Sequence, residues 1–298
     1  MPEPQADVNL PQIRLVAKIA LVIGICLTIL KFLIFNLTNS VAILTDALES
    51  IINVAAAGIM LYVIWLANEP ADECHHYGHG KAEYMAVGLE GGFIFITSIV
   101  ITYESIFRLV QGTAPEQLEL GLILVGLVTL LCGGLASYVW LMGLRYNNAP
   151  LVADGKHLMT DVISTVGVLA GLGLMKITGW RWIDPITAMI MAGLIFFMGR
   201  KLLVQSYHGL MDRSDPQVNH VITNILDEEV AGGKIKSYHK VRHRRSGKFL
   251  WIDLHIQVDS RMNVKDSHAL ASTIENRIEQ NLGQANATAH VEPYNEDN

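Results

Sequence analysis

Six long apolar segments constrain the fold of this chain more than any other feature. A hydrocarbon core about 30 Å thick needs roughly 20 consecutive helical residues for each crossing. Segments of that length lie at approximately 14–36, 41–67, 83–108, 118–143, 153–176 and 184–207. Composition agrees, because 51% of the residues are hydrophobic and only 17% are charged. The sequence therefore predicts an α-helical membrane domain with six transmembrane helices over residues 1–208.

From residue 209 onward the pattern becomes that of a soluble α/β domain. Two stretches have helical spacing and three are β-rich, and a Ser246-Gly247 turn separates the first two strands. The expected elements are a helix at 215–229, strands at 235–245 and 248–258, a helix at 263–282 and a strand at 285–291. This order matches a small ferredoxin-like, metallochaperone-like sheet. A domain as small as 209–298 gains stability by pairing with a second copy.

Two of the apolar segments carry polar side chains that are costly in a membrane. His157 and Asp161 stand four residues apart in the fifth segment. Glu49 and Asn53 have the same spacing in the second, and Asp46 lies one turn earlier. On helices, this spacing places each pair on one face. A charged side chain at mid-bilayer costs about 2.5–3.5 kcal/mol, so such groups usually face the bundle interior and a partner.

The two polar pairs are most simply explained together. A lone membrane histidine more often bonds a nearby carbonyl group. Two helices that each carry a pair of oxygen and nitrogen donors can instead surround one small divalent cation. We interpret this arrangement as the binding site of a metal transporter.

The loop between the second and third segments is rich in potential metal ligands. Residues 69–83 contain three histidines and four carboxylates. Asp72, His75 and His79 are spaced so that a turn could fold them around one ion. Three such donors and a water suit tetrahedral zinc, with bonds of about 2.0–2.2 Å. The alternative is a hydrophilic loop that only separates two helix ends, but this density of histidine favours a metal site.

Basic residues near the ends of the segments predict the orientation in the membrane. If six helices alternate, seven of these residues share one side: Arg14, Lys18, Lys81, Arg145, Arg200, Lys201 and Arg213. Arg108, Lys176 and Arg181 flank the other side. We therefore expect a multi-pass protein of the inner (plasma) membrane, with both termini and the C-terminal domain in the cytoplasm.

Charge and cysteine content argue against several other classes. The net charge of −6 argues against a nucleic-acid partner. The basic cluster at residues 242–245 is a candidate exception, although a solvated strand face explains it more simply. The polar N-terminal stretch has no basic residue before position 14, and the first apolar run is too long for a cleavable signal. Three scattered cysteines are too few for a disulfide framework or a zinc ribbon.

Taken together, these features resemble the cation diffusion facilitator family of six-helix zinc, iron and manganese efflux carriers. The most specific pieces are Tyr-Gly-His-Gly-Lys-Ala-Glu at residues 77–83, the His-x-x-x-Asp of the fifth segment and the histidines of the C-terminal domain. The resemblance covers the chain from the first segment to Pro293. It implies a homodimer in the lipid bilayer that exchanges divalent cations for protons.

The resemblance implies a transport site at Glu49, Asn53, His157 and Asp161. Family members usually have His or Asp where Glu49 stands and Asp where Asn53 stands. The neutral amide of Asn53 departs from this pattern and puts tetrahedral zinc selectivity in question. Asp46 matches an acidic position beside the family site, where it is either a supporting residue or a substitute ligand.

Outside the membrane segments, the resemblance implies three further assignments. Asp72, His75 and His79 match the family's loop site. Five residues of the C-terminal domain match positions that bind a pair of zinc ions in the zinc-efflux members, with a glutamate in place of the usual aspartate: His239, His255, His268, His290 and Glu292. Lys81 and Asp212 match a charge pair that links the membrane halves of two protomers to their C-terminal domains.

The expected function is export of zinc or iron(II) from the cytoplasm by metal/proton antiport and alternating access, with manganese, cobalt and cadmium as further candidates. Divalent ions are then both substrate and structural or regulatory ligands of the C-terminal domain. One alternative is a transport-inactive membrane metal sensor or scaffold. An enzyme or a haem carrier is not expected, because the chain has no HExxH motif and His157 is the only histidine in the six segments.

Overall fold

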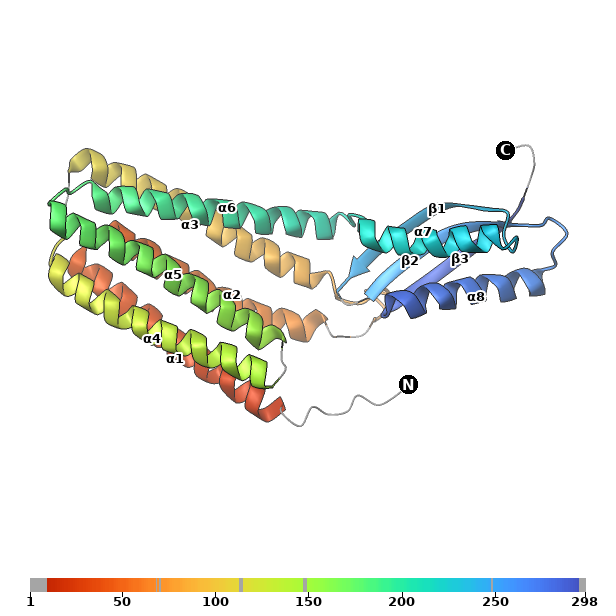
Figure 1. Cartoon of the computed structure of the whole chain (residues 1–298), viewed down its shortest axis with the longest axis horizontal. Coiled ribbons are helices and arrows are strands. Elements are labelled where there is room, and N and C mark those ends of the chain that lie inside the picture. The colour runs from red at the N-terminus through yellow and green to blue at the C-terminus, as the bar shows by residue number, and fades with distance from the viewer. Residues whose placement is uncertain are drawn as a thin grey trace. The chain divides into compact units, whose positions relative to one another are not determined.

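The computed structural model describes residues 10–67, 69, 71–112, 115–146, 149–247 and 249–294. Six long helices come first in the chain (Figure 1), namely α1 (Leu10–Thr38), α2 (Val41–Ala67), α3 (Ala82–Gln111), α4 (Leu118–Arg145), α5 (Ala149–Thr178) and α6 (Ile183–Leu210). Each of them covers one of the six predicted apolar segments. Two compact units divide the chain, Met1–Ile59 with Leu89–Leu203 and Met60–Gly88 with Val204–Asn298.

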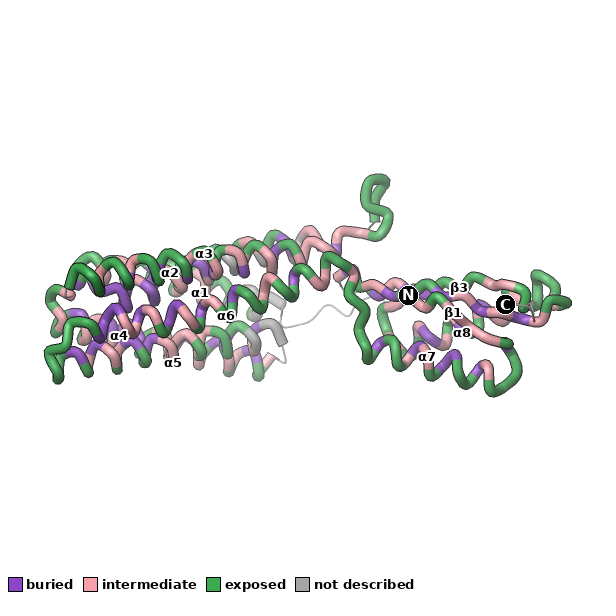
Figure 2. Tube along the Cα trace, turned by 90° about the horizontal axis from the view of Figure 1, so that it is seen from above, coloured by how far each residue is buried: buried purple, intermediate pink, exposed green. Residues whose placement is uncertain are grey.

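The surface of the helical unit is apolar, as a lipid-facing surface requires. Figure 2 shows buried residues along the inner sides of the helices and exposed residues along their outer sides. The exposed positions include large apolar side chains, among them Leu130 at 75% and Phe197 at 67% exposure. Among the described residues, five helices are long and apolar enough to cross a membrane, namely α1, α3, α4, α5 and α6. The chain therefore has a helical membrane domain.

The start of α2 is held by a carboxylate from another helix. Asp184, in the first turn of α6, accepts hydrogen bonds from the Ser40 hydroxyl at 2.5 Å and from the backbone N–H of Val41 at 3.0 Å. The first N–H groups of a helix have no partner within it, so this carboxylate caps α2. The contact fixes the start of α2, the helix that carries Glu49 and Asn53, against the start of α6.

Glycines allow α4 and α5 to approach closely. A Cβ atom placed on Gly143 of α4 would lie 2.6 Å from the backbone nitrogen of Val152 in α5. One placed on Gly155 of α5 would lie 2.5 Å from the nitrogen of Trp140 in α4. Small residues of this kind are typical of close contacts between membrane helices. The two glycines set the position of the segment of α5 that carries His157 and Asp161.

The C-terminal elements follow the predicted order: α7 (Pro216–Ala231), β1 (Ser237–Ser246), β2 (Phe249–Val258), α8 (Val264–Leu282) and β3 (Ala285–Pro293). The sheet order is β1-β2-β3, with β1 antiparallel and β3 parallel to β2. Every second residue of β2 is buried, from Leu250 to Val258, so one face of the sheet meets the core. Ile222 of α7 and Ile274 of α8 are completely buried in that core.

Candidate metal centres

Three of the predicted transport residues line one small cavity between the membrane helices. Glu49 and Asn53 reach it from α2, and His157 reaches it from α5. Its volume is about 10 Å³, which is about the space that one water needs. The other lining residues are Ile52, Ile94, Thr97, Ile195 and Met198. The spacing of four residues on α2 places Glu49 and Asn53 in the lining of this cavity, and α5 adds His157.

Asp161 joins this group through a hydrogen bond between α2 and α5. The side-chain nitrogen of Asn53 donates to Oδ2 of Asp161 over 2.8 Å. An amide nitrogen cannot bind a cation, because its lone pair is delocalised and its hydrogens point outward. The Asn53 amide must therefore rotate to offer its oxygen to a metal. The structure thus places three of the predicted transport residues around one cavity and joins the fourth, Asp161, to them through Asn53.

Asp46 forms hydrogen bonds with residues outside the group of four predicted transport ligands. Its Oδ1 atom accepts hydrogen bonds from Nζ of Lys31 at 2.9 Å and from the Thr165 hydroxyl at 2.6 Å. Asp46 and Lys31 are both only 5% exposed. Asp46 is not among the residues that line the cavity beside Glu49. In the sequence, Lys31 is a single charge within the first apolar segment, and nothing beside it identifies Asp46 as its partner.

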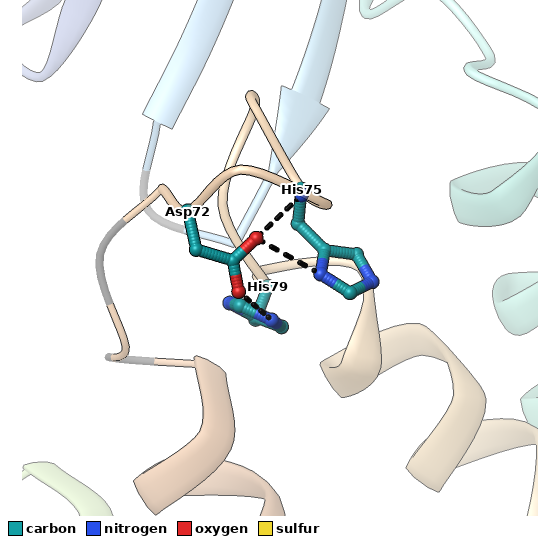
Figure 3. A group of neighbouring side chains, drawn as sticks. All are labelled: Asp72, His75 and His79. Atoms are coloured by element: carbon teal, nitrogen blue, oxygen red, sulfur yellow. Dashed lines mark hydrogen bonds and ion pairs between the residues drawn. The ribbon is translucent and has the colours of Figure 1, made fainter.

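The three predicted loop ligands point toward one another (Figure 3). Their potential ligand atoms all lie within 4.8 Å of each other. Oδ1 of Asp72 is 3.3 Å from Nδ1 of His75, and Oδ2 is 3.6 Å from Nε2 of His79. The spacing in the sequence is explained by a local turn, because Asp72 accepts hydrogen bonds from the backbone N–H groups of Cys74 and His75.

The electrostatics of the loop cluster favour a cation. The hydrogen bond from the backbone N–H of His75 holds the pKa of Asp72 below its usual value, so the carboxylate stays ionised. Nδ1 of His79 is buried and has no hydrogen-bond partner among the described residues. One carboxylate and two imidazoles with water as a fourth ligand fit zinc or another small divalent ion.

The loop that carries this cluster is fixed to the β1–β2 hairpin. The guanidinium carbon of Arg244 lies 4.0 Å from the centre of the Tyr77 ring, in a cation–π contact. Tyr77 also meets Trp251 edge to face, with 5.0 Å between ring centres. A Cβ atom on Gly80 would lie 2.5 Å from the nitrogen of Gly247. The basic cluster at residues 242–245 therefore includes a docking residue for the loop, which sequence reasoning missed.

Lys81 and Asp212 form an ion pair within the chain. Nζ of Lys81 lies 3.0 Å from the Asp212 carboxylate. Asp212 follows α6 and has a positive φ of 53°, a conformation that aspartate tolerates better than most residues. The pair joins the start of α3 to the segment that leads into the C-terminal domain.

Three histidines of the C-terminal domain lie side by side across the sheet. His239 of β1 pairs with His255 of β2, and His255 pairs with His290 of β3. The ring centres are 5.1 Å apart in the first pair and 4.8 Å apart in the second. The strand register therefore explains why residues far apart in the sequence meet on one face.

Glu292 completes this cluster, because it lies two residues after His290 and so on the same face of β3. Its carboxylate oxygens are 2.7 Å from Nδ1 of His255 and 3.3 Å from Nε2 of His239. The hydrogen bond with His255 holds the pKa of Glu292 below its usual value. The ligand atoms of His239, His255 and Glu292 all lie within 4.8 Å of one another.

His268 does not belong to this compact group. It lies on α8, is exposed, and lines a depression of about 390 Å³ that Glu292 also borders. The structure thus brings four of the five predicted residues together and places the fifth along the same depression.

Known protein families account for nearly the whole chain. Residues 17–211 match the cation efflux transmembrane domain, and residues 215–294 match the cytoplasmic domain of cation efflux proteins. The chain therefore belongs to the cation efflux family, the cation diffusion facilitators, as the sequence predicts. It is a multi-pass membrane protein of a family that transports divalent metal cations.

Individual relatives cover most of the chain. An uncharacterized transporter of Synechocystis sp. is 36% identical over 266 residues, which are 89% of this chain and 85% of the relative. The manganese efflux system protein MneP of Bacillus subtilis is 28% identical over 293 residues, 95% and 97% of the two chains. Among solved structures, the metal-bound C-terminal domain of the CzcD transporter from Thermotoga maritima is 29% identical, with a TM-score of 0.26, over 29% of this chain and 98% of that domain.

Proposed function

We propose that this protein exports a divalent metal cation from the cytoplasm in exchange for protons, and that Glu49, Asn53, His157 and Asp161 bind the cation. The observation that carries the proposal is the meeting of α2 and α5 at these positions. Three of the side chains line one cavity, and the fourth is hydrogen-bonded to Asn53. Groups of this kind are rare and costly inside a membrane unless they have a function.

The chemistry of the ligands supports coupling to protons. A metal binds deprotonated imidazole and carboxylate, so metal binding releases protons and protons displace the metal. Histidine is the side chain that changes charge near cytoplasmic pH. Exchange across the membrane then requires that the cavity open alternately to each side, by rocking of α2 and α5 against the other helices.

Zinc, iron(II) and manganese are the candidate substrates. Asn53 supplies a neutral oxygen where an aspartate would supply a charged one, and this favours harder ions over zinc. The relative from Bacillus subtilis is named as a manganese efflux protein, which agrees with that tendency. The histidines of the loop and the C-terminal domain are softer donors and suit zinc or iron(II).

The architecture that goes with this function has six membrane spans. Five of them are the helices that are long and apolar enough among the described residues, and α2 is the sixth. Residues 1–208 form the transport domain, and residues 209–298 form a ferredoxin-like cytoplasmic domain that pairs with a second copy. The helix, two strands, helix and strand in that order support this assignment. Both termini lie in the cytoplasm, and the membrane is the inner (plasma) membrane.

The loop and C-terminal clusters are proposed as structural or regulatory metal sites. Asp72, His75 and His79 form the first of them. In the second, His268 and the cluster of His239, His255, His290 and Glu292 hold about two ions in each protomer. Lys81 and Asp212 keep the loop and the C-terminal domain connected while the helices move.

One observation favours a second function, a membrane metal sensor without transport. Among the described residues, the clusters with ligand atoms within 4.8 Å of each other lie outside the apolar helices. In that case the protein would bind metals through its loop and C-terminal domain, and the cavity at Glu49 would carry no flux.

Transport by purified protein in liposomes separates the two functions. Vesicles with an imposed pH gradient are given zinc, iron(II), manganese, cobalt or cadmium in turn, and both metal uptake and internal pH are recorded. If the protein is an antiporter, at least one metal is taken up while protons move in the opposite direction. Metal binding by the protein without uptake of any of the five metals would favour the sensor.

A further inference from the structure

A buried ion pair connects α1 to α2 close to the proposed transport site. Nζ of Lys31 lies 2.9 Å from Oδ1 of Asp46 and 2.8 Å from the hydroxyl of Ser50. An unpaired ammonium group in an apolar helix is costly, and a compensating carboxylate removes much of this cost. Because Ser50 lies between Glu49 and Asn53 on α2, Lys31 bonds the same helical turn that supplies two proposed ligands.

The network continues from Asp46 to α5. The hydroxyl of Thr165 lies 2.6 Å from Oδ1 of Asp46 and 2.9 Å from the backbone oxygen of Asp161. Thr165 is one turn after Asp161 and only 2% exposed. Any rotation of α5 that moved Asp161 would therefore also break the contact between Thr165 and Asp46.

From these contacts we propose that Lys31 is a positioning residue for transport. It keeps Asp46 away from the cation. It also holds α2 and α5 in the rotation that places Asn53 beside Asp161. The inference rests on the proposed transport function. It assigns Asp46 to support of the site and leaves Asn53 as the fourth ligand.

The partners of Asp46 carry this assignment. Its Oδ1 atom already accepts from both Lys31 and Thr165. For Asp46 to bind a cation, it would have to leave the Lys31 ammonium without a counter-charge in an apolar environment. The charge of Lys31 also acts on Asp161, so its removal changes the electrostatics of the cation site as well as the geometry.

Four variants in proteoliposomes test the proposal: Lys31→Met, Asp46→Asn, the double variant Lys31→Met/Asp46→Asn, and Lys18→Met as a control. Lys18 is on the same helix but exposed. Each single change at the pair leaves one charge buried and uncompensated, and we expect turnover to fall about 10–100-fold, as for other residues that orient metal ligands. The double variant removes both charges and should recover most of the turnover, with a KM for the cation near that of the unchanged protein.

The outcomes are distinct. If Asp46 is itself a ligand, the double variant stays as inactive as Asp46→Asn, or its KM rises with that of Asp46→Asn, and the proposal is overturned. If Lys31→Met transports like the control, the pair has no positioning role and the proposal also fails. A variant that does not elute as a folded protein is replaced by the corresponding pair Lys31→Gln and Lys31→Gln/Asp46→Asn. Absence of transport by the unchanged protein would contradict the proposed function itself, before the variants are compared.

Discussion

The side-chain nitrogen of Asn53 on α2 lies 2.8 Å from Oδ2 of Asp161 on α5. This hydrogen bond links the two helices that carry the proposed cation ligands. It also stabilises the site without a metal, because two carboxylates at the same distance would repel each other unless a proton or a cation lay between them. Compared with an aspartate at this position, Asn53 makes the site less negative, and its hydrogen bond stabilises the metal-free protein.

Replacement of Asn53 by Asp should reverse this balance. We expect Asn53→Asp to lower the KM for zinc about tenfold, which corresponds to about 1.4 kcal/mol, because affinity rises with the charge of the ligands. The KM for manganese should change less, so that selectivity shifts toward zinc. Uptake of the two metals into vesicles measures both values. Asn219→Asp, at an exposed position of α7, is the matched control, and equal effects of the two variants would show that Asn53 is not a ligand.

The contact between Tyr77 and Arg244 should hold in place the loop that carries the proposed metal site. Cation–π contacts at exposed sites contribute about 0.5–1 kcal/mol. We expect a double-mutant cycle of Tyr77→Ala and Arg244→Ala to give a coupling energy of that size in thermal unfolding of the full chain. Both variants should also weaken zinc binding at Asp72, His75 and His79. Arg242→Ala removes an exposed charge from the same strand, and its coupling to Tyr77→Ala should be close to zero.

The C-terminal cluster should lose stability in acid. The hydrogen bond from His255 holds the pKa of Glu292 below its value of 4.5 in an unfolded chain. A carboxylate with a lowered pKa contributes stability above pH 4.5, and this contribution is lost as the pH falls through the lower, folded-state pKa. The unfolding temperature of the metal-free protein should therefore exceed that of Glu292→Gln near pH 6, and the difference should shrink as the pH falls below 4.5. A difference that stays constant over this range would show that folding does not lower the pKa of Glu292.

The sequence predicted the order of the helices and strands, because each element depends on a local pattern. Runs of apolar residues marked the six helices, and the spacing of Asp72, His75 and His79 reflects a single turn that the structure contains. The alternation of buried residues in β2 was also visible in the sequence. These features need only neighbouring residues to be recognised.

Contacts between distant segments could not be predicted in this way. Thr165 and Asp46 are separated by 119 positions, and nothing in either segment identifies the other as its partner. The contacts of Tyr77 with Arg244 and with Trp251 depend on the register of the hairpin. In the sequence, Thr165 is an ordinary helix residue and Arg244 an ordinary strand residue. Their contacts with Asp46 and Tyr77 become visible only in the folded protein.

Proton movement coupled to metal uptake tests most directly whether His157 and Asp161 bind the transported cation. Liposomes that contain His157→Ala or Asp161→Ala, a pH-sensitive dye and a metal indicator are compared with the unchanged protein. Glu119→Ala, which removes an exposed carboxylate paired with Lys176 at 3.0 Å, is the control, since such surface pairs contribute only about 0–1 kcal/mol. We expect both site variants to elute as folded protein and to show neither metal uptake nor metal-dependent proton movement, while the control retains both. Metal–proton exchange at the rate of the unchanged protein in either site variant would contradict the assignment.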